Sequence, residues 1–276
     1  MQFLLKEASK LFTSKGLSQL ADGDMSLIQK ISTELLGGDV CSSLYDTYNK
    51  IYCIIDKKYK TEYFFKNAIV NRHLLGKHSL NTATMLSEFR VGSSKADCVI
   101  INGSSVCYEI KTEYDSLYRL DEQLKDYCAF FDEVYVVCAP LNFKSVYEAT
   151  PDSVGIMVLT ADNYLSVKKM AKKRSTPLCP VTVIKSLRKD EYILLAELIS
   201  GEKITCSNSD VFSVCLDKFY QAEPDALAEQ LRMILKLSRK NNKEFICSLP
   251  YSLKNAAISY SFNKKQIDSL IIRFNS

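Results

Sequence analysis

The chain has 276 residues, a formal net charge of +4, and 47% hydrophobic and 25% charged residues, as in ordinary soluble globular proteins. This length fits one elaborated domain or two small ones, and the mild positive charge permits a polyanionic partner without requiring one. The two histidines, His73 and His78, nearly exclude a histidine-rich zinc site, and no apolar run approaches the roughly 20 residues of a membrane span.

The N-terminal third is predicted to be helical. Amphipathic helices are expected over 2–15 and 24–36, with Gly16 and the pair Gly37-Gly38 as their stops. A further helical stretch is expected over 44–75, ending at Gly76.

Residues 85–160 have the pattern of an α/β core. Short apolar runs separated by glycine, serine and asparagine predict strands, at 85–91, 96–101, 105–111, 133–139 and 154–160. The last two runs are short, apolar and rich in β-branched residues, which is typical of buried parallel strands. An amphipathic helix is expected between them and the first three strands, over 116–131.

The remainder of the chain is predicted to be mostly helical, over 161–173, 185–199, 225–240 and 263–274. The sequence therefore predicts three regions: an N-terminal helical extension over 1–58, a core over 59–160 and a helical C-terminal region over 161–276. Whether this last region is a separate domain or a cover on the core stays open.

Ten cysteines occur without a CxxC pair. The first residues carry Lys6, Glu7 and Lys10, which do not suit the apolar core of a signal peptide. Several cysteines lie within apolar runs, where a free thiol acts as a small hydrophobe: Cys98, Cys107, Cys128 and Cys138. The expected compartment is a reducing cytoplasm.

Three charges interrupt two neighbouring apolar strands in the run EFRVGSSKADCVIINGSSVCYEIK, residues 88–111. They are Asp97 on one strand and Glu109 and Lys111 on the next. A strict two-residue Asn102-Gly103 turn would place Asp97 opposite Tyr108, with Glu109 pointing away. A connection that is one residue longer places Asp97 opposite Glu109. Convergence of the charges therefore requires the looser turn.

Two carboxylates suit Mg²⁺ or Mn²⁺, which take oxygen ligands, and Lys111 suits orientation of a water or stabilisation of negative charge. The competing interpretation is a salt bridge of Lys111 with Glu109 or Asp97, without catalysis. The spacing of these residues alone does not decide between the two.

Asp97 followed by Glu109-Ile110-Lys111 resembles the PD-(D/E)XK nuclease superfamily. The longer run EFRVGSSKAD…VCYEIKTEYDSLYRLDEQLKDY is similar to a small bacterial branch of nuclease-like proteins known mainly under a locus-tag name. The close resemblance covers roughly residues 60–140, and weaker similarity reaches SLPYSLKNAAI and NKKQIDSL. It implies a restriction-endonuclease-like α/β fold with an αβββαβ mixed-sheet core.

The resemblance assigns roles within this motif. Asp97 and Glu109 match the metal ligands and Lys111 matches the catalytic lysine, while Ala96 replaces the proline of the name. A third acid is expected upstream, with Glu88 preferred and Glu62 as the alternative. Mg²⁺ or Mn²⁺ is the implied cofactor.

The helix over 116–131 carries a second signal. Arg119, Gln123 and Tyr127 are four residues apart and form one stripe beside its apolar face. Gln123 to Tyr127 resembles the QxxxY element of exonuclease-type members, so Gln123 is expected to support catalysis, and Arg119 and Tyr127 to contact nucleic acid. A plain amphipathic helix is the alternative.

Basic residues supply further candidate DNA contacts: Lys95, and Lys168 and Lys172 in a cluster that continues with Lys169, Lys173 and Arg174. A solvated surface explains most clusters of this kind.

The expected function is hydrolysis of DNA phosphodiester bonds, with roles in defence against phage or mobile DNA among those that fit. A non-cleaving nucleic-acid- or protein-binding module of the same fold is the alternative. DNA is the expected partner, a homodimer or a partner protein also fits, and no membrane association is expected.

Overall fold

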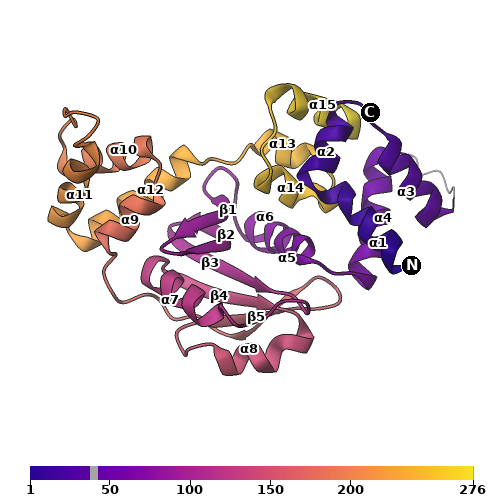
Figure 1. Cartoon of the computed structure of the whole chain (residues 1–276), viewed down its shortest axis with the longest axis horizontal. Coiled ribbons are helices and arrows are strands. Elements are labelled where there is room, and N and C mark those ends of the chain that lie inside the picture. Colours follow the sequence, from indigo (N-terminus) through magenta and orange to yellow (C-terminus); the bar gives the residue numbers. More distant parts are fainter. Residues whose placement is uncertain (38–42, 276) are drawn as a thin grey trace. The chain divides into compact units, whose positions relative to one another are not determined.

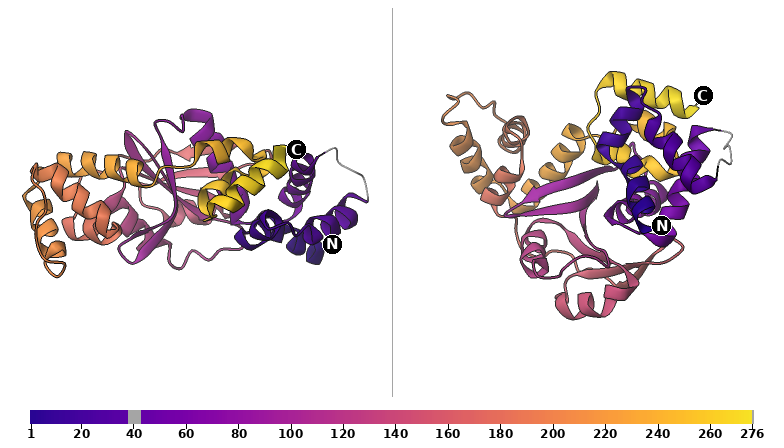
Figure 2. Two further views of the ribbon diagram at one scale, coloured as in Figure 1. Left: turned by 90° about the horizontal axis from the view of Figure 1, so that it is seen from above. Right: turned by 45° about the vertical axis from the view of Figure 1, so that its right-hand side comes forward.

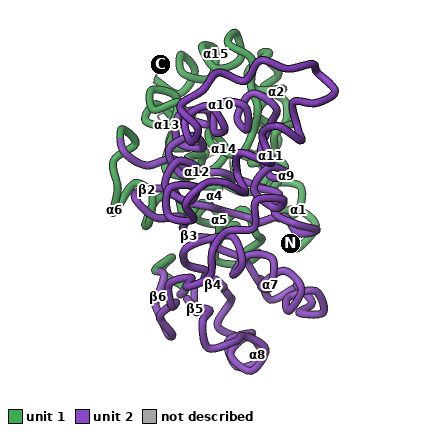
Figure 3. The backbone as a smooth tube through the Cα atoms, turned by 90° about the vertical axis from the view of Figure 1, so that its left-hand side faces the viewer, with its two compact units in different colours: residues 1–81, 161–164, 241–276 green, residues 82–160, 165–240 purple. Residues whose placement is uncertain are grey.

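The computed structural model describes residues 1–37 and 43–275. Gly38, expected as part of a helix stop, and Cys41 lie outside these ranges. The chain forms two compact units, coloured separately in Figure 3. The first unit comprises Met1–Asn81, Ala161–Tyr164 and Asn241–Ser276, and the second comprises Thr82–Thr160 and Leu165–Lys240. Both units are discontinuous in sequence, so neither coincides with the predicted regions 1–58, 59–160 and 161–276.

The first unit is helical. Its N-terminal helices are α1 (Gln2–Ser9), η1 (Lys10–Phe12), α2 (Ser14–Ala21), α3 (Ser26–Leu36), α4 (Leu44–Lys58), α5 (Glu62–Ile69), the π-helical η2 (Val70–Leu74) and α6 (Leu75–Lys77). Its C-terminal helices are α13 (Lys243–Ser248), η4 (Tyr251–Leu253), α14 (Lys254–Ser259) and α15 (Lys264–Asn275). Figures 1 and 2 both show these yellow C-terminal helices beside the indigo N-terminal ones.

A separate aromatic core holds the two ends of the chain together in the first unit. The ring of Phe12 lies 5.7 Å from those of Tyr48 and Tyr52, and Tyr48 lies 5.2 Å from Phe274. The fully buried Asn67 accepts a hydrogen bond from the backbone of Asn255 at 3.0 Å. Because a buried amide without partners is costly, this bond fixes the C-terminal helices on α5.

The predicted helix over 2–15 is divided in two. Thr13 is extended, and its side chain accepts a hydrogen bond from Gly16 N–H, which caps the start of α2. Gly16 therefore lies inside a helix and is not the expected stop: a Cβ there would lie 2.2 Å from the Lys10 carbonyl oxygen. The second predicted stop is confirmed, because Gly37 ends α3 with a φ of 65°.

The second unit contains a six-stranded mixed sheet, so the chain is α/β as predicted. Its strands follow one another in sequence order: β1 (Thr84–Val91), β2 (Ser94–Asn102), β3 (Ser104–Lys111), β4 (Glu133–Cys138), β5 (Gly155–Leu159) and β6 (Leu165–Lys169). The first three strands are antiparallel, and β3, β4 and β5 are mutually parallel. The expectation of buried parallel strands over 133–139 and 154–160 is confirmed.

Helices complete the second unit: α7 (Leu120–Phe130), η3 (Pro140–Asn142), α8 (Phe143–Ala149), α9 (Pro180–Ser186), α10 (Lys189–Ser200), α11 (Val211–Gln221) and α12 (Pro224–Ser238). Leu124 of α7, Val136 of β4 and Leu231 of α12 belong to one buried core. This shared core fixes α7 against the sheet, which positions the side chains described below.

The predicted helix over 161–173 is wrong. Asn163 adopts a left-handed φ of 57°, and the chain then pairs with β5 as the antiparallel strand β6. Leu165 is buried and Val167 is exposed, so the apolar positions do not build the continuous stripe that a helix would need. The basic residues from Lys168 to Arg174 therefore do not share a helical face.

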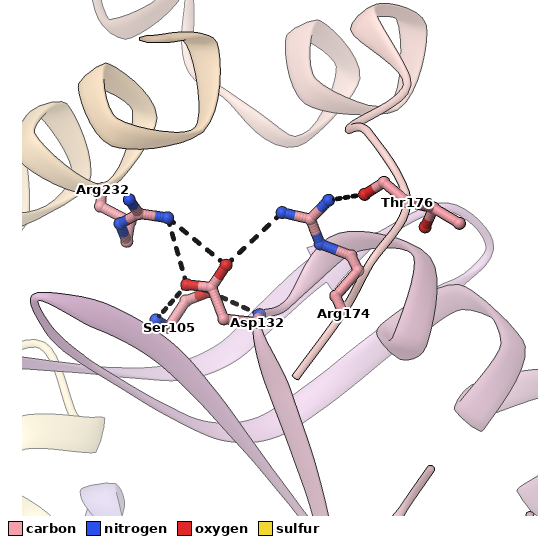
Figure 4. Close-up of polar contacts among 5 residues, drawn as sticks. All are labelled: Ser105, Asp132, Arg174, Thr176 and Arg232. Carbon is pink, nitrogen blue, oxygen red and sulfur yellow. Dashed lines mark hydrogen bonds and ion pairs between the residues drawn. The ribbon is translucent and has the colours of Figure 1, made fainter. Parts of the chain in front are cut away.

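Asp132 joins four segments of the second unit (Figure 4). Its Oδ2 accepts hydrogen bonds from Ser105 N at 2.7 Å and Ser105 Oγ at 3.0 Å, at the start of β3. Its carboxylate also pairs with Arg174 at 3.4 Å and with Arg232 of α12 at 3.2 Å. One acid at the α7–β4 junction thus ties β3, the segment after β6 and α12 together.

Gly155, at the start of β5, is needed for close packing. A Cβ at this position would lie 2.3 Å from the Tyr135 ring and 2.7 Å from Ala171 N. We expect Gly155→Ala to lower the free energy of unfolding by about 1–3 kcal/mol, the usual cost of overpacking. Chemical denaturation measures the loss. Gly201→Ala is the control, because the added Cβ meets nothing within 4 Å there and only the backbone φ of 72° disfavours alanine. A loss of stability as large as that of Gly155→Ala would contradict this account.

None of the described helices is long and apolar enough to cross a membrane. The cysteines of the described ranges are all free thiols, as predicted.

Candidate active site

The connection between β2 and β3 has the looser form that convergence of the charges requires. Ile101 pairs with Ser105 and Cys98 pairs with Tyr108, with Gly103 at the tip in a left-handed φ of 76°. Continuing this register by one residue places Asp97 opposite Glu109. The predicted three-residue turn is confirmed.

Asp97 is held against the following strand. Its Oδ2 accepts a hydrogen bond from Ile110 N–H at 2.8 Å, directly beside Glu109. This bond fixes the direction of the carboxylate. Asp97 is only partly buried, so its carboxylate is within reach of solvent.

Glu88 lies in β1, level with Asp97 of β2. Its neighbours Ser87 and Phe89 pair with Cys98 and Ala96, whereas Glu88 has a left-handed φ of 58°. A non-glycine residue rarely adopts this conformation in a strand, and such strain clusters at functional sites. Carboxylate oxygens of Glu88 and Asp97 lie within 4.8 Å of each other. Glu88 also forms an ion pair with Lys95.

Lys111 is fixed between two side chains from different elements. Its Nζ donates to Glu109 Oε1 at 2.7 Å and to Gln123 Oε1 of α7 at 3.0 Å. Glu109 is 2% exposed and Lys111 is 7% exposed. The structure thus brings Gln123 of the α7 stripe to Lys111, and it also contains the salt bridge of the competing interpretation.

Burial dominates the electrostatics around Glu109. It raises the pKa of Glu109, and the positive charge of Lys111 opposes that rise. Burial, followed by the charge of Glu109, also raises the pKa of Tyr127 well above its usual range. Glu109 Oε2 and the Tyr127 hydroxyl are both buried, and each side chain affects the pKa of the other: Tyr127 lowers that of Glu109, and Glu109 raises that of Tyr127.

Tyr127 does not have the predicted role in binding nucleic acid. Its side chain is fully buried in the core beneath α7, so it is out of reach of a macromolecular ligand. Arg119 is exposed at the N-cap of α7.

The remaining candidates lie on several different elements. Lys168 and Lys172 are exposed on and after β6, and Lys95 is partly exposed and paired with Glu88. Glu62 lies on α5 in the first unit, where it forms an ion pair with Lys66 at 2.6 Å. Glu109 does not form a three-carboxylate group with Glu88 and Asp97 in the described part of the chain.

The donors around Asp97 fit the divalent cation that the resemblance implies. Mg²⁺ and Mn²⁺ take carboxylate oxygens, and Asp97 and Glu109 supply these from facing positions of two strands. Glu109 Oε2 is buried and has no hydrogen-bond partner among the described residues, which is the state expected of a ligand atom. Glu88 adds a third carboxylate beside Asp97.

The buried Glu109 predicts a pH dependence of stability. A raised pKa in the folded state means that folding favours the protonated acid, so this contribution to stability is complete below about pH 4.5 and is lost as pH rises through the folded-state pKa. We expect the free energy of unfolding of wild type, measured in EDTA, to fall relative to that of Glu109→Gln as the pH rises through this pKa. The difference between the two proteins should change by at most about 1.4 kcal/mol per pH unit. Denaturation curves at several pH values test this. Parallel pH profiles would contradict it.

Two exposed tyrosines beside the site were not among the predicted site residues. Tyr114 and Tyr118 lie on the loop that follows Lys111 and are 59% and 92% exposed. The signal in the sequence was the pair of aromatic residues in the polar segment TEYDSLYR, between a strand and a helix.

Residues 56–259 match the family described as Bacteriophage P4 protein cII, over more than half of the chain. The chain belongs to this family. In the Bacteriophage P4 protein cII family, the Protein cII of Enterobacteria phage P4 is 39% identical over 92 residues, which cover 33% of this chain. The match spans about a third, 35%, of that relative's length.

A solved structure, the SPO1766 protein of unknown function from Silicibacter pomeroyi, is 17% identical over 50% of this chain and 91% of that chain. The TM-score is 0.32, which is too low to carry an argument about fold. None of these names states an activity or a ligand.

Proposed function

We propose that the second unit is a divalent-metal-dependent deoxyribonuclease of the PD-(D/E)XK type, with a restriction-endonuclease-like core. The observation that carries the proposal is the register of the β2–β3 hairpin. It places Asp97 opposite Glu109, and Lys111 is held two residues further along β3. A one-residue difference in the turn would separate these groups.

Each residue has a chemical role in the proposal. Asp97 and Glu109 hold the cation and Glu88 completes its ligands, while the bound cation supplies Lewis acidity for phosphodiester hydrolysis. Lys111, oriented by Gln123 at 3.0 Å, stabilises negative charge on the phosphate oxygens or positions the attacking water. Exposed Arg119, Lys95, Lys168 and Lys172 supply positive charge for the DNA backbone.

A second candidate function is binding of nucleic acid or protein without cleavage. It is favoured by the 2.7 Å salt bridge between Lys111 and Glu109, because a lysine neutralised by a buried acid is a stable structural pair. The pair alone does not account for the left-handed strain at Glu88 or for the orientation of Asp97 by Ile110 N–H. These two features support the nuclease.

Incubation of supercoiled plasmid and of linear single-stranded DNA with the purified chain tests the proposal. We expect cleavage of one or both substrates with Mg²⁺ or Mn²⁺ and none with EDTA. Binding of DNA with no cleavage of either substrate in either metal would favour the second candidate function instead.

A further inference from the structure

The loop after Lys111 projects large aromatic side chains to solvent at the end of β3. This aromatic loop comprises residues 112–119, between β3 and α7. Its Tyr118 is 92% exposed and its Tyr114 is 59% exposed, and Leu141 after β4 is 78% exposed. Because exposed apolar area is costly unless a partner covers it, such a cluster marks an interaction surface.

Hydrogen bonds hold the aromatic loop in a defined shape. Asp115 Oδ2 accepts from Thr112 N at 2.8 Å and from Thr112 Oγ1 at 2.7 Å. Asn142 donates to the Thr112 carbonyl oxygen at 2.6 Å, which joins the loop to the segment after β4. Leu117 packs against the core beside Tyr118. The tyrosines are therefore presented on a fixed backbone, which lowers the entropy cost of binding.

The position of the loop, after the carboxyl end of a parallel strand, favours ligand binding there. β3, β4 and β5 are parallel, and the aromatic loop and Leu141 follow the carboxyl ends of β3 and β4. Ligands of α/β sheets bind beyond the carboxyl ends of parallel strands. Lys111, the last residue of β3, directly precedes the loop.

The aromatic side chains of the loop, more than its charges, bear on the kind of nucleic acid. The exposed charges on or next to the loop are of both signs: Arg119, and Glu113, Asp121 and Glu122. A duplex presents phosphates and keeps its bases stacked inside, whereas a single strand offers base faces that stack on aromatic rings.

We propose that Tyr114 and Tyr118 stack with unpaired bases, so that the substrate class of the site is single-stranded DNA or an unpaired DNA end. This inference rests on the proposed nuclease function and specifies its substrate. Stacking on tyrosine tolerates any base, so the loop selects strandedness and not sequence.

Fluorescence anisotropy of the full chain with labelled oligo(dT), in EDTA so that nothing is cleaved, tests the inference. We expect tighter binding to oligo(dT) than to a duplex of the same length. Tyr118→Ala and Tyr114→Ala should each weaken binding of the single strand by about fivefold or more, the low end of base–aromatic stacking. Tyr118→Phe and Tyr114→Phe keep the ring and should bind like wild type.

Tyr220→Ala is the matched control, because Tyr220 is 60% exposed on α11, away from the loop. Equal affinity of wild type for single strand and duplex, or alanine variants that bind like Tyr220→Ala, would overturn the inference. Failure of the nuclease proposal is distinguishable from this result. In that case plasmid and oligo(dT) stay intact with Mn²⁺, whatever the affinities measured in EDTA.

Discussion

Substitution of Lys111 by alanine is expected to slow metal-dependent DNA cleavage by about 100-fold or more. The expected loss is that of removing one preorganised charge from a transition state that accumulates negative charge. Lys111 is suited to this role because Gln123 and Glu109 fix its Nζ at 3.0 and 2.7 Å. Cleavage of labelled single-stranded and plasmid DNA under single-turnover conditions measures the effect.

Two further variants separate chemistry from folding. Lys111→Ala also leaves the buried Glu109 without its ion pair, so its folding is checked by circular dichroism and thermal melting. Asp97→Asn keeps an oxygen for the Ile110 N–H bond and removes only the charge, and we expect the same loss of cleavage. Lys125→Ala, at an exposed lysine of α7 that pairs with Asp121, should cleave like wild type. Undiminished cleavage by Lys111→Ala or Asp97→Asn would remove these residues from the mechanism.

The second large effect concerns stability. We expect Asp132→Ala to lower the free energy of unfolding by about 3 kcal/mol, since it leaves two largely buried arginines without their acid. The side chains of Arg174 and Arg232 are only 10% and 23% exposed, and Ser105 N–H loses its 2.7 Å acceptor as well. Urea denaturation followed by circular dichroism measures the change.

Asp121→Ala is the matched control for Asp132→Ala. Asp121 also pairs with a basic side chain, Lys125, but it is 72% exposed, so its loss should change stability by less than about 1 kcal/mol. Equal effects of the two substitutions would show that the Asp132 contacts do not hold the four segments together.

The sheet of the second unit was predictable because short-range sequence patterns mark its strands. Short apolar runs correspond to β1 to β5, with glycine and asparagine between the first three, and the uninterrupted run over 133–139 indicated a parallel strand. The contacts of the candidate site were also foreshadowed in the sequence: three charges in apolar strands and the stripe on α7 pointed to Asp97, Glu109, Lys111 and Gln123, which the structure joins by hydrogen bonds.

Features that depend on a few backbone angles were not predictable in this way. A helix was predicted over 161–173, but the left-handed turn at Asn163 and pairing with β5 make Leu165–Lys169 a strand. Propensity is a weak prior that tertiary pairing overrides.

The division into units depends on contacts between distant segments. The fully buried Asn67 binds the backbone of Asn255, which assigns the C-terminal helices to the N-terminal unit, and no local pattern encodes this bond. Tyr127 illustrates the same limit: its spacing put it on a stripe with Arg119, but the packing of α7 buries it entirely.

The most direct test of the central claim is the position of a bound metal. In a crystal soaked with Mn²⁺, we predict an anomalous density peak coordinated by carboxylate oxygens of Asp97 and Glu109, and no such peak in Asp97→Asn. The account would be contradicted if wild-type crystals showed no Mn²⁺ between these two side chains after a soak at an Mn²⁺ concentration that supports cleavage by other metal-dependent nucleases.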